Sequence, residues 1–416
     1  MPKSINCRHR LRTGAVLPLA TLAALVAGYT FPAVADDQSF EVVHSFVGGK
    51  KDGAWPFSYL IRDQSGNIYG TTESGGGIQP ICSGSGCGTI FEIAPDGDET
   101  IYSFSPKKAG AYPLDGLLED SAGNLYGTAQ SGGRHGCGSV FKLAPDGAET
   151  TLHSFACNNG TDKKGTFPQY NLITDGKGDL FSTTEFGGDL QACNGAGCGA
   201  VFELKPDGAE KVLYSFTGGN DGSSPSSGLL RIAGNLYGAT AQGGGGSCNG
   251  GCGVVYKLAG EKRHSWAEGV LYVFTGGNDG SGPTGDLMAD RAGNLYGTTA
   301  AGGAYSEGTV FKIAPDGAET VLYAFSGGED GAEPLGGVIA DKQGNLYGTT
   351  VGGGASDSGT VFRLAPDGAE TTLHSFAGSD GASPGRGALL EVGHYLYGTT
   401  IEGGSANYGV VFRVRK

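Results

Sequence analysis

The stretch Gly66-Asn67-Ile68-Tyr69-Gly70-Thr71-Thr72 occurs seven times along the chain with small changes. The other copies lie at residues 123–128, 178–184, 234–240, 293–299, 344–350 and 393–400. The aromatic member returns every 50 to 59 residues, at Tyr69, Tyr126, Phe181, Tyr237, Tyr296, Tyr347 and Tyr397. A fixed period in this range is typical of a β-propeller or a solenoid.

Each repeat contains four short segments with the composition of strands. In one copy these are residues 320–325, 338–341, 345–350 and 359–364, separated by glycine-rich loops. The tight link Pro366-Asp367-Gly368 follows, in which proline presets the first turn dihedral and glycine accepts a positive one. With 80 glycines in 416 residues and no collagen register, the composition also predicts an all-β fold of short strands.

The two ends of the repeat array decide between a ring and an open stack. The first outer strand, residues 42–46, has no strand before it, and the last segment, residues 410–414, has no outer strand after it. Pairing these two segments would complete the last sheet and leave no exposed terminal edge. The sequence therefore predicts a seven-bladed β-propeller with four strands per blade, closed by the N-terminal strand, over residues 36–416.

The N-terminal 35 residues have the features of a secretory signal peptide. Four basic residues precede an apolar run from Gly14 to Tyr29, and Ala33-Val34-Ala35 offers a cleavage site. A retained membrane anchor is the alternative, although the run is short for a span and contains Pro18. We expect a secreted or periplasmic protein that is monomeric and has no membrane span after processing.

The charge balance argues against nucleic acid as a partner. The chain carries 28 basic and 42 acidic side chains, and removal of the first 35 residues would take away four basic and no acidic ones. Such an acidic surface repels phosphate backbones. An acidic polysaccharide would need a local basic patch, for which the loops offer few residues: Arg134, Lys163, Lys164 and Arg386.

The whole repeat unit, Gly-Asn-Leu-Tyr-Gly-Thr-Thr through Gly-Thr-Val-Phe-Lys-Leu to Ala-Pro-Asp-Gly, resembles the bacterial GloVer tandem repeat. The resemblance covers about residues 40–416. It implies a repeat protein that is exported or anchored at the cell surface, and it implies no defined activity. Because the chain ends on the last strand without a sorting segment, we expect a freely soluble member.

Eight cysteines follow the signal segment, and an exported even set favours disulfides over zinc. Local pairs are plausible for Cys82 with Cys87, Cys193 with Cys198 and Cys248 with Cys252, which leaves Cys137 for Cys157. Sequence alone permits 105 pairings. These bridges would staple glycine-rich loops that have little core of their own.

Most histidines occupy structural positions. His44, His153 and His374 stand where other repeats have tyrosine, His394 replaces the asparagine of the motif, and His264 lies in an insertion. The exception is His135, which lies beside Arg134 in a long loop and is a candidate base, although a lone loop histidine is usually just solvated.

An aspartate precedes the recurring proline in six repeats, at Asp52, Asp162, Asp221, Asp279, Asp330 and Asp380. Such carboxylates are either a weak calcium signal or ordinary Asp-Gly turn chemistry, and we favour the turn. Apart from weakly possible calcium, we expect no cofactor and no metal.

The clearest departures from the repeat are three aromatic residues before the recurring proline: Trp55, Tyr112 and Phe167. The other four repeats carry Ser224, Gly282, Glu333 and Ser383 there. Three neighbouring rings predict either a platform on which sugars stack or packing between blades. We expect ligand binding by these three residues and Arg134. Further candidates at the top of the inner strands are Tyr59, Asp115, Tyr170, Asn171, Asp286 and Arg386.

Two function classes remain. The first is a binding or scaffolding propeller for a carbohydrate, a polysaccharide or a surface protein. The second is a polysaccharide lyase or glycoside hydrolase acting at the long-loop face, because propellers host both kinds of function. In the enzyme, Tyr59, Tyr170 or His135 would serve as base, Arg134 or Arg386 would neutralise a carboxylate, and Asp115 with Asp286 would form an acid/base pair.

Overall fold

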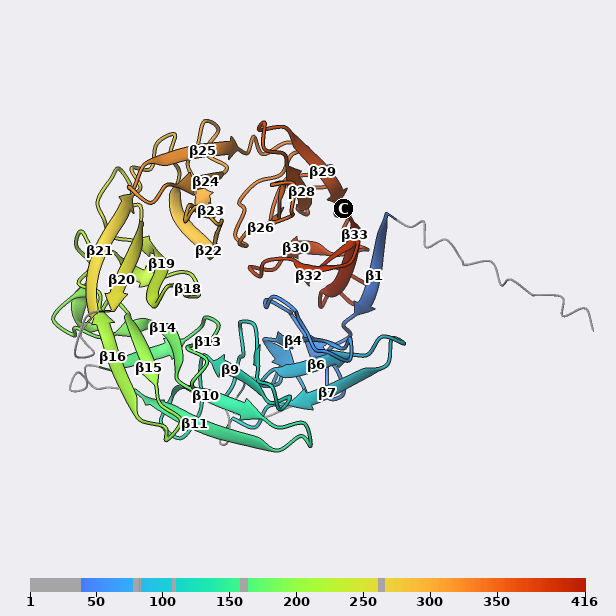
Figure 1. The fold of residues 1–416 in the computed structure, drawn as a ribbon. Helices are drawn as coiled ribbons and strands as arrows, with labels where there is room; N and C mark the ends of the chain where they lie inside the picture. Colours follow the sequence, from blue (N-terminus) through green and yellow to red (C-terminus); the bar gives the residue numbers. More distant parts are fainter. Residues whose placement is uncertain (1–38, 78–81, 83, 107–109, 158–163, 261–265) are drawn as a thin grey trace, which may run out of the picture. The chain divides into compact units, whose positions relative to one another are not determined.

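The computed structural model describes residues 39–416 apart from residues 78–81, 83, 107–109, 158–163 and 261–265. The chain divides into two units, Met1–Gln38 and Ser39–Lys416. The predicted signal peptide therefore lies outside the described residues, as do Asp162, Lys163 and His264. The unit Ser39–Lys416 is a ring of seven β-sheets, which confirms the predicted propeller (Figure 1).

The first four sheets follow each other along the chain. Blade 1 contains β3 (Ile61–Arg62), β4 (Ile68–Thr72), β6 (Thr89–Ile93) and β7 (Glu99–Ser103). Blade 2 contains β8 (Leu118–Glu119), β9 (Leu125–Ala129), β10 (Gly136–Leu143) and β11 (Glu149–Ala156). Blade 3 contains β12 (Gly165–Pro168), β13 (Ile173–Thr174), β14 (Leu180–Gly187), β15 (Ala200–Leu204) and β16 (Glu210–Ser215). Blade 4 contains β17 (Ser223–Pro225), β18 (Leu230–Ile232), β19 (Asn235–Gln242), β20 (Val254–Gly260) and β21 (Trp266–Val273).

The remaining sheets complete the ring. Blade 5 contains β22 (Ser281–Ala289), β23 (Leu295–Ala301), β24 (Thr309–Ile313) and β25 (Glu319–Ala324). Blade 6 contains β26 (Ile339–Ala340), β27 (Leu346–Thr350), β28 (Thr360–Leu364) and β29 (Glu370–Ser375). Blade 7 contains β30 (Ala382–Pro384), β31 (Leu390–Val392), β32 (Tyr395–Glu402), β33 (Val410–Arg415) and β1 (Phe40–Ser45). A small ribbon, β2 (Gly53–Ala54) with β5 (Ser74–Gly75), and a 3-10 turn at Cys193–Gly195 lie in loops.

The N-terminal strand closes the ring. β1 pairs antiparallel with β33, from Phe40 opposite Val414 to Ser45 opposite Val410, and both strands lie side by side in Figure 1. The outer edge of blade 7 is thus supplied from the opposite end of the chain. This pairing confirms the closure that the two unpaired terminal segments predict.

Two contacts recur at the junctions between blades. A phenylalanine lies at or beside the last residue of each outer strand. The ring of this phenylalanine packs edge to face against an aromatic ring in the third strand of the next blade, as Phe46 does against Phe91 with ring centroids 5.1 Å apart. The glycine that opens the third strand packs against the next recurring proline, so that a Cβ on Gly409 would lie 2.7 Å from Pro56 Cδ. The recurring glycine and proline are therefore explained by close approach between blades.

Four disulfides join the predicted pairs: Cys82–Cys87, Cys137–Cys157, Cys193–Cys198 and Cys248–Cys252. Three of them close loops of four or five residues before the third strand, and Cys137–Cys157 spans 20 residues. The bridges all lie in the first four repeats, where they staple long loops.

Candidate functional site: a polar cavity at the centre of the ring

A cavity of about 290 Å³ lies among the inner segments of the blades. Its lining comes from blades 1, 2, 3, 4, 5 and 7 and consists of Phe57, Tyr59, Glu73, Leu114, Asp115, Gln130, Gln169, Tyr170, Ser226, Gly285, Asp286 and Arg386. Most of these residues stand one to three positions after the recurring proline. The repeat therefore directs the same short segment of most blades toward one site.

A belt of threonine hydrogen bonds fixes these segments. The first threonine of the motif donates its hydroxyl to a main-chain carbonyl of the next blade, as Thr71 does to Asp115 O at 3.0 Å. Thr128 repeats the bond to Tyr170 O at 3.1 Å, and Thr399 closes the belt to Ser58 O at 3.1 Å. Because these hydroxyls are buried or nearly so, the belt holds the inner segments rigidly around the cavity.

The carboxyl group of Asp115 is held by two main-chain donors. The N–H of Gly116 donates to Oδ1 at 2.7 Å, and the N–H of Asn171 in blade 3 donates to Oδ2 at 2.8 Å. Burial and the charge of Asp286 raise the pKa of Asp115 well above its usual value, while these donors and Arg386 act in the opposite direction.

The carboxyl group of Asp286 belongs to the same network. The N–H of Gly228 in blade 4 donates to its Oδ1 at 2.6 Å, and the Tyr59 hydroxyl acts to lower the pKa of this carboxyl group. Burial raises the pKa of Asp286. Burial and the charges of Asp286 and Asp115 also raise the pKa of Tyr59, so this phenol stays protonated near neutral pH.

Two further side chains add an unpaired polar atom and a positive charge to the site. The buried Oδ1 of Asn171 has no hydrogen-bond partner among the described residues. Arg386 is exposed and is the one basic side chain among the lining residues. Burial raises the pKa of Tyr170, and the positive charge of Arg386 opposes that effect. The cavity thus presents acceptors, amides and one cation to whatever enters it.

The structure brings together five of the residues proposed from the sequence: Tyr59, Asp115, Tyr170, Asp286 and Arg386. Asn171 contacts them through its main chain. Arg134 and His135 lie in the loop of blade 2 and are not among the lining residues, and the main-chain N–H of His135 donates to Ser154 Oγ at 3.1 Å.

Sequence reasoning missed seven lining residues, of which four have large side chains that carry polar or aromatic groups: Phe57, Glu73, Gln130 and Gln169. Phe57 and Gln169 directly follow the recurring proline, and Glu73 and Gln130 directly follow the motif that ends in Thr-Thr or Thr-Ala. These are fixed repeat positions, so an alignment of the seven repeats by position would have found them.

The three aromatic departures lie outside this cavity. Trp55, Tyr112 and Phe167 have φ values of 59°, 60° and 58°, and the equivalent residues of the other four blades also have positive φ. The rings are half-buried, and Tyr112 packs against the cluster that contains the Cys82–Cys87 bridge. Phe167 meets Phe186 at 6.0 Å. Packing between neighbouring loops thus explains part of their placement, and ligand binding by them stays a prediction.

The loop aspartates are engaged by donors from their own blade. At Asp279, Oδ2 accepts from the N–H of Thr275 at 2.7 Å and from the Tyr272 hydroxyl at 3.1 Å, and Oδ1 accepts from the Thr275 hydroxyl at 2.6 Å. Asp221 and Asp330 repeat these three bonds. These bonds match the turn chemistry expected from the sequence.

The sequence matches a known repeat family along most of its length. The profile of the Gloeobacter/Verrucomicrobia repeat matches residues 24–250, 163–340 and 320–416. The chain belongs to this repeat family. The resemblance noted from the repeat unit is therefore confirmed, whereas no curated protein matches the chain.

Two solved structures share the fold of this repeat protein at low identity. A puromycin-hydrolyzing peptidase of Mycobacterium tuberculosis aligns with 11% identity, a TM-score of 0.55 and 89% of this chain, which spans 55% of the peptidase. A puromycin hydrolase aligns with 13% identity, a TM-score of 0.53 and 84% of this chain, which spans 50% of that enzyme. The chain therefore spans about half the length of these two hydrolases. A putative gluconolactonase aligns with 13% identity, a TM-score of 0.42, 75% of this chain and 89% of its own length.

Within the described part of this repeat protein, no helix reaches the length and apolar character needed to cross a bilayer.

Proposed function

We propose that this propeller binds a saccharide in its central cavity. The observation that carries the proposal is the convergence of Asp115 and Asp286, whose carboxyl groups are oriented by main-chain donors from neighbouring blades. Oriented carboxyl oxygens with free lone pairs accept well from the vicinal hydroxyls of a sugar. The amides of Gln130 and Gln169 line the same cavity and offer donors and acceptors to further hydroxyls.

The cavity also favours a particular kind of sugar. Arg386 is exposed at this site and offers a planar cation to a carboxylate. Phe57 and Tyr59 supply aromatic surface, on which sugar rings stack. A glycan that contains uronic acid residues fits this combination better than a neutral glycan does.

A glycoside hydrolase or lyase is the second candidate, and the raised pKa values of Asp115 and Asp286 favour it. A raised pKa makes a carboxyl group better suited to act as a general acid. The raised pKa values of Tyr59 and Tyr170 make a tyrosinate base costly. Within this candidate class, acid-catalysed hydrolysis is therefore better supported than tyrosine-initiated elimination.

The cellular setting belongs to the proposal as well. Four disulfides are typical of proteins in an oxidising compartment. The formal net charge of −14 disfavours nucleic acid. We therefore place the binding function in the periplasm or outside the cell, with a polysaccharide or a glycan of a surface protein as partner.

A panel of neutral and uronic acid polysaccharides and their oligosaccharides tests both candidates together. Binding is measured by calorimetry, and incubated samples are assayed for new reducing ends and for unsaturated ends. Binding without new ends supports the binding module, new reducing ends without unsaturation support the hydrolase, and unsaturated ends support the lyase. Binding of no member of the panel would contradict the proposal.

A further inference from the structure

A polar cluster recurs on the outer rim at the junctions between blades. A tyrosine or histidine of one outer strand, an aspartate of the following loop and a glutamate at the start of the next outer strand come together there. In Tyr272, Asp279 and Glu319 the aspartate accepts the tyrosine hydroxyl at 3.1 Å, and the charge of Glu319 acts on the tyrosine. The rim cluster is therefore part of the repeat, and its members vary from junction to junction.

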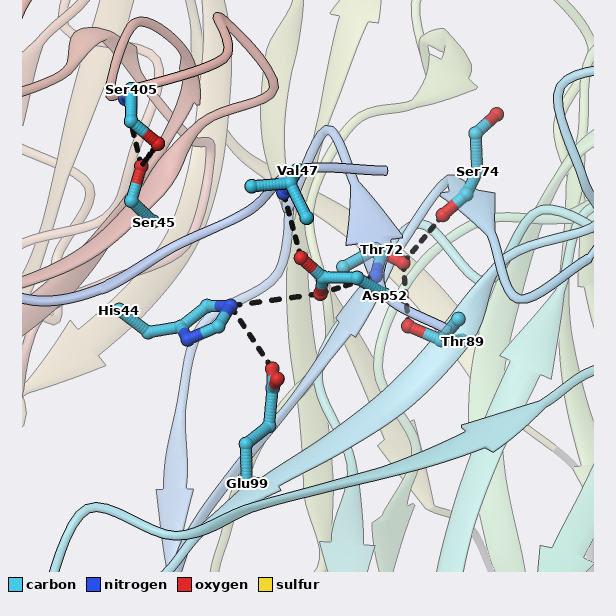
Figure 2. Close-up of polar contacts among 10 residues, drawn as sticks. His44, Ser45, Val47, Asp52, Thr72, Ser74, Thr89, Glu99 and Ser405 are labelled. Atoms are coloured by element: carbon cyan, nitrogen blue, oxygen red, sulfur yellow. Dashed lines mark hydrogen bonds and ion pairs between the residues drawn. The ribbon is translucent and has the colours of Figure 1, made fainter. Parts of the chain in front are cut away.

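At the closing junction the cluster consists of His44, Asp52 and Glu99. Nε2 of His44 lies 3.1 Å from Oε1 of Glu99 and 3.6 Å from Oδ1 of Asp52, and one ligand atom from each residue lies within 4.8 Å of the others. Figure 2 shows all three side chains directed toward one point. His44 comes from β1 and Glu99 from β7, so the cluster joins blade 7 to blade 1.

Two atoms of this cluster lack hydrogen-bond partners. Nε2 of His44 and Oε1 of Glu99 are both buried, and neither forms a hydrogen bond with the described residues. The 3.1 Å contact between them therefore lacks the direction of a hydrogen bond. Leaving a buried nitrogen and a buried carboxyl oxygen unsatisfied is costly, and a shared cation would satisfy both.

The separations suit a divalent transition metal. Bonds from zinc to nitrogen or oxygen of about 2.0 to 2.2 Å at the tetrahedral angle place ligand atoms about 3.3 to 3.6 Å apart. The two measured separations, 3.1 and 3.6 Å, are close to that range. One imidazole and two carboxylates are typical zinc ligands, and their two negative charges balance the ion.

A supporting shell also exists. The carboxyl group of Asp52 accepts from the N–H of Val47 and from the N–H of Gly53, each at 2.6 Å. These bonds orient the carboxylate toward the histidine (Figure 2). The side chains of His44 and Glu99 are 22% and 21% exposed, so the cluster lies close to the surface.

We propose that His44, Asp52 and Glu99 bind a divalent transition-metal ion of the zinc type at the closing junction of the ring. The ion would link β1 to β7 and so hold blade 7, whose outer strand comes from the N-terminal end of the chain, against blade 1. A cation there stabilises the docked N-terminal strand by mass action.

The other histidine junctions show why this one is distinct. At His153 the carboxylate of Glu210 lies 3.6 Å from the ammonium group of Lys164, so a cation is already supplied. At His374 the place of the glutamate is taken by Phe40, whose ring stacks on the imidazole at 3.5 Å. His374 contacts Asp380 at 2.9 Å and so has one carboxylate instead of two. The His153 junction therefore has a lysine ammonium group beside its glutamate, and the His374 junction lacks the glutamate.

The experiment measures Zn²⁺ binding to chelator-treated protein by calorimetry, together with the melting temperature. His44→Tyr installs the residue that four other repeats carry at this position, so the variant keeps the rim structure. Glu99→Gln is a second variant that removes a ligand without changing volume. His374→Tyr is the matched control at a junction with one carboxylate.

We expect one Zn²⁺ site per chain, with affinity reduced at least about 100-fold in His44→Tyr and Glu99→Gln and unchanged in His374→Tyr. Excess Zn²⁺ should raise the melting temperature of the wild type and of His374→Tyr by about 2 to 5 °C, and of the other two variants by much less. Absence of a site in the wild type, or wild-type affinity in both His44→Tyr and Glu99→Gln, would overturn the proposal.

Discussion

The main-chain N–H of Asn171 in blade 3 donates to the side-chain carboxyl group of Asp115 in blade 2 across 2.8 Å. A carboxyl group of one blade is thus oriented by the backbone of a neighbouring blade, and the N–H of Gly228 in blade 4 likewise donates to Asp286 in blade 5. Because these donors are backbone groups, the orientation of the two carboxyl groups depends on the position of each blade relative to its neighbour. Closure of the ring and the central cavity are therefore coupled.

This coupling makes the N-terminal strand essential. A chain that begins at Val47 lacks β1 and the Phe46 ring, which is fully buried against Phe91. We expect it to lose cooperative unfolding because the edge of β33 is uncovered. A chain that begins at Ser39 keeps both features and is the control. Equal thermal melting curves for the two chains would show that the β1–β33 pairing contributes nothing.

The disulfides should contribute according to the length of chain that they close. Replacing Cys137 and Cys157 by serine opens a 20-residue loop and should lower the free energy of unfolding by about 3 kcal/mol. Replacing Cys82 and Cys87 opens a loop of five residues and should cost about 2 kcal/mol. Denaturant titrations measure both. A larger loss from the short bridge would contradict the entropic explanation.

We expect the rim glutamate Glu319 to make the free energy of unfolding depend on pH. Burial and the charge of Asp279 raise the pKa of Glu319 to about 7. The folded state therefore binds this proton more tightly than the unfolded state, so this contribution to stability is present below about pH 4.5 and is lost as the pH rises through about 7.

Glu319→Gln removes that titration. At pH 8 the variant should be more stable than the wild type by about 1 to 2 kcal/mol, and at pH 4 the two should agree. Glu329→Gln, at an exposed side chain, is the control and should follow the wild type at both values. A constant difference between Glu319→Gln and wild type across this range would exclude the charge of Glu319 as the cause.

A double substitution can distinguish whether the aromatic residues before the proline pack between loops or stack on a sugar. Trp55→Ser with Tyr112→Ser installs the residue that blades 4 and 7 carry at the same positive φ. Because Tyr112 packs against a buried cluster, we expect the double variant to lose about 2 to 4 kcal/mol of stability. If the rings also stack on a sugar, its affinity should fall about tenfold. Unchanged stability together with lost affinity would make them a ligand platform alone.

The architecture could be predicted from the sequence because every repeat carries the same turn and strand residues at the same positions. The Pro-Asp-Gly links, the recurring glycines and the two unpaired end segments determine strand order and closure, and the spacing of the cysteines suggested all four bridges. Tyr59 and Asp286 stand third after the recurring proline and Asp115 stands second, at positions where several other repeats carry glycine or serine.

What the sequence could not provide was distance across the ring. Gln130 and Asp286 are far apart in the chain, and only the closed ring places them on one cavity. The rim site at His44 was likewise read as a packing variant of tyrosine, because its two carboxylates come from a loop and from a different blade. Contacts between repeats depend on the ring radius, which no single repeat encodes.

Saccharide binding in the central cavity is tested most directly by the affinity of the tightest-binding uronic acid oligosaccharide for Arg386→Gln. The side chain of Arg386 is exposed, so the variant should melt at the wild-type temperature. Arg291→Gln, an exposed arginine away from the cavity lining, is the control. We predict at least about a tenfold loss of affinity for Arg386→Gln and none for Arg291→Gln. Wild-type affinity in Arg386→Gln, with a loss in the Trp55→Ser, Tyr112→Ser variant instead, would contradict binding in the central cavity.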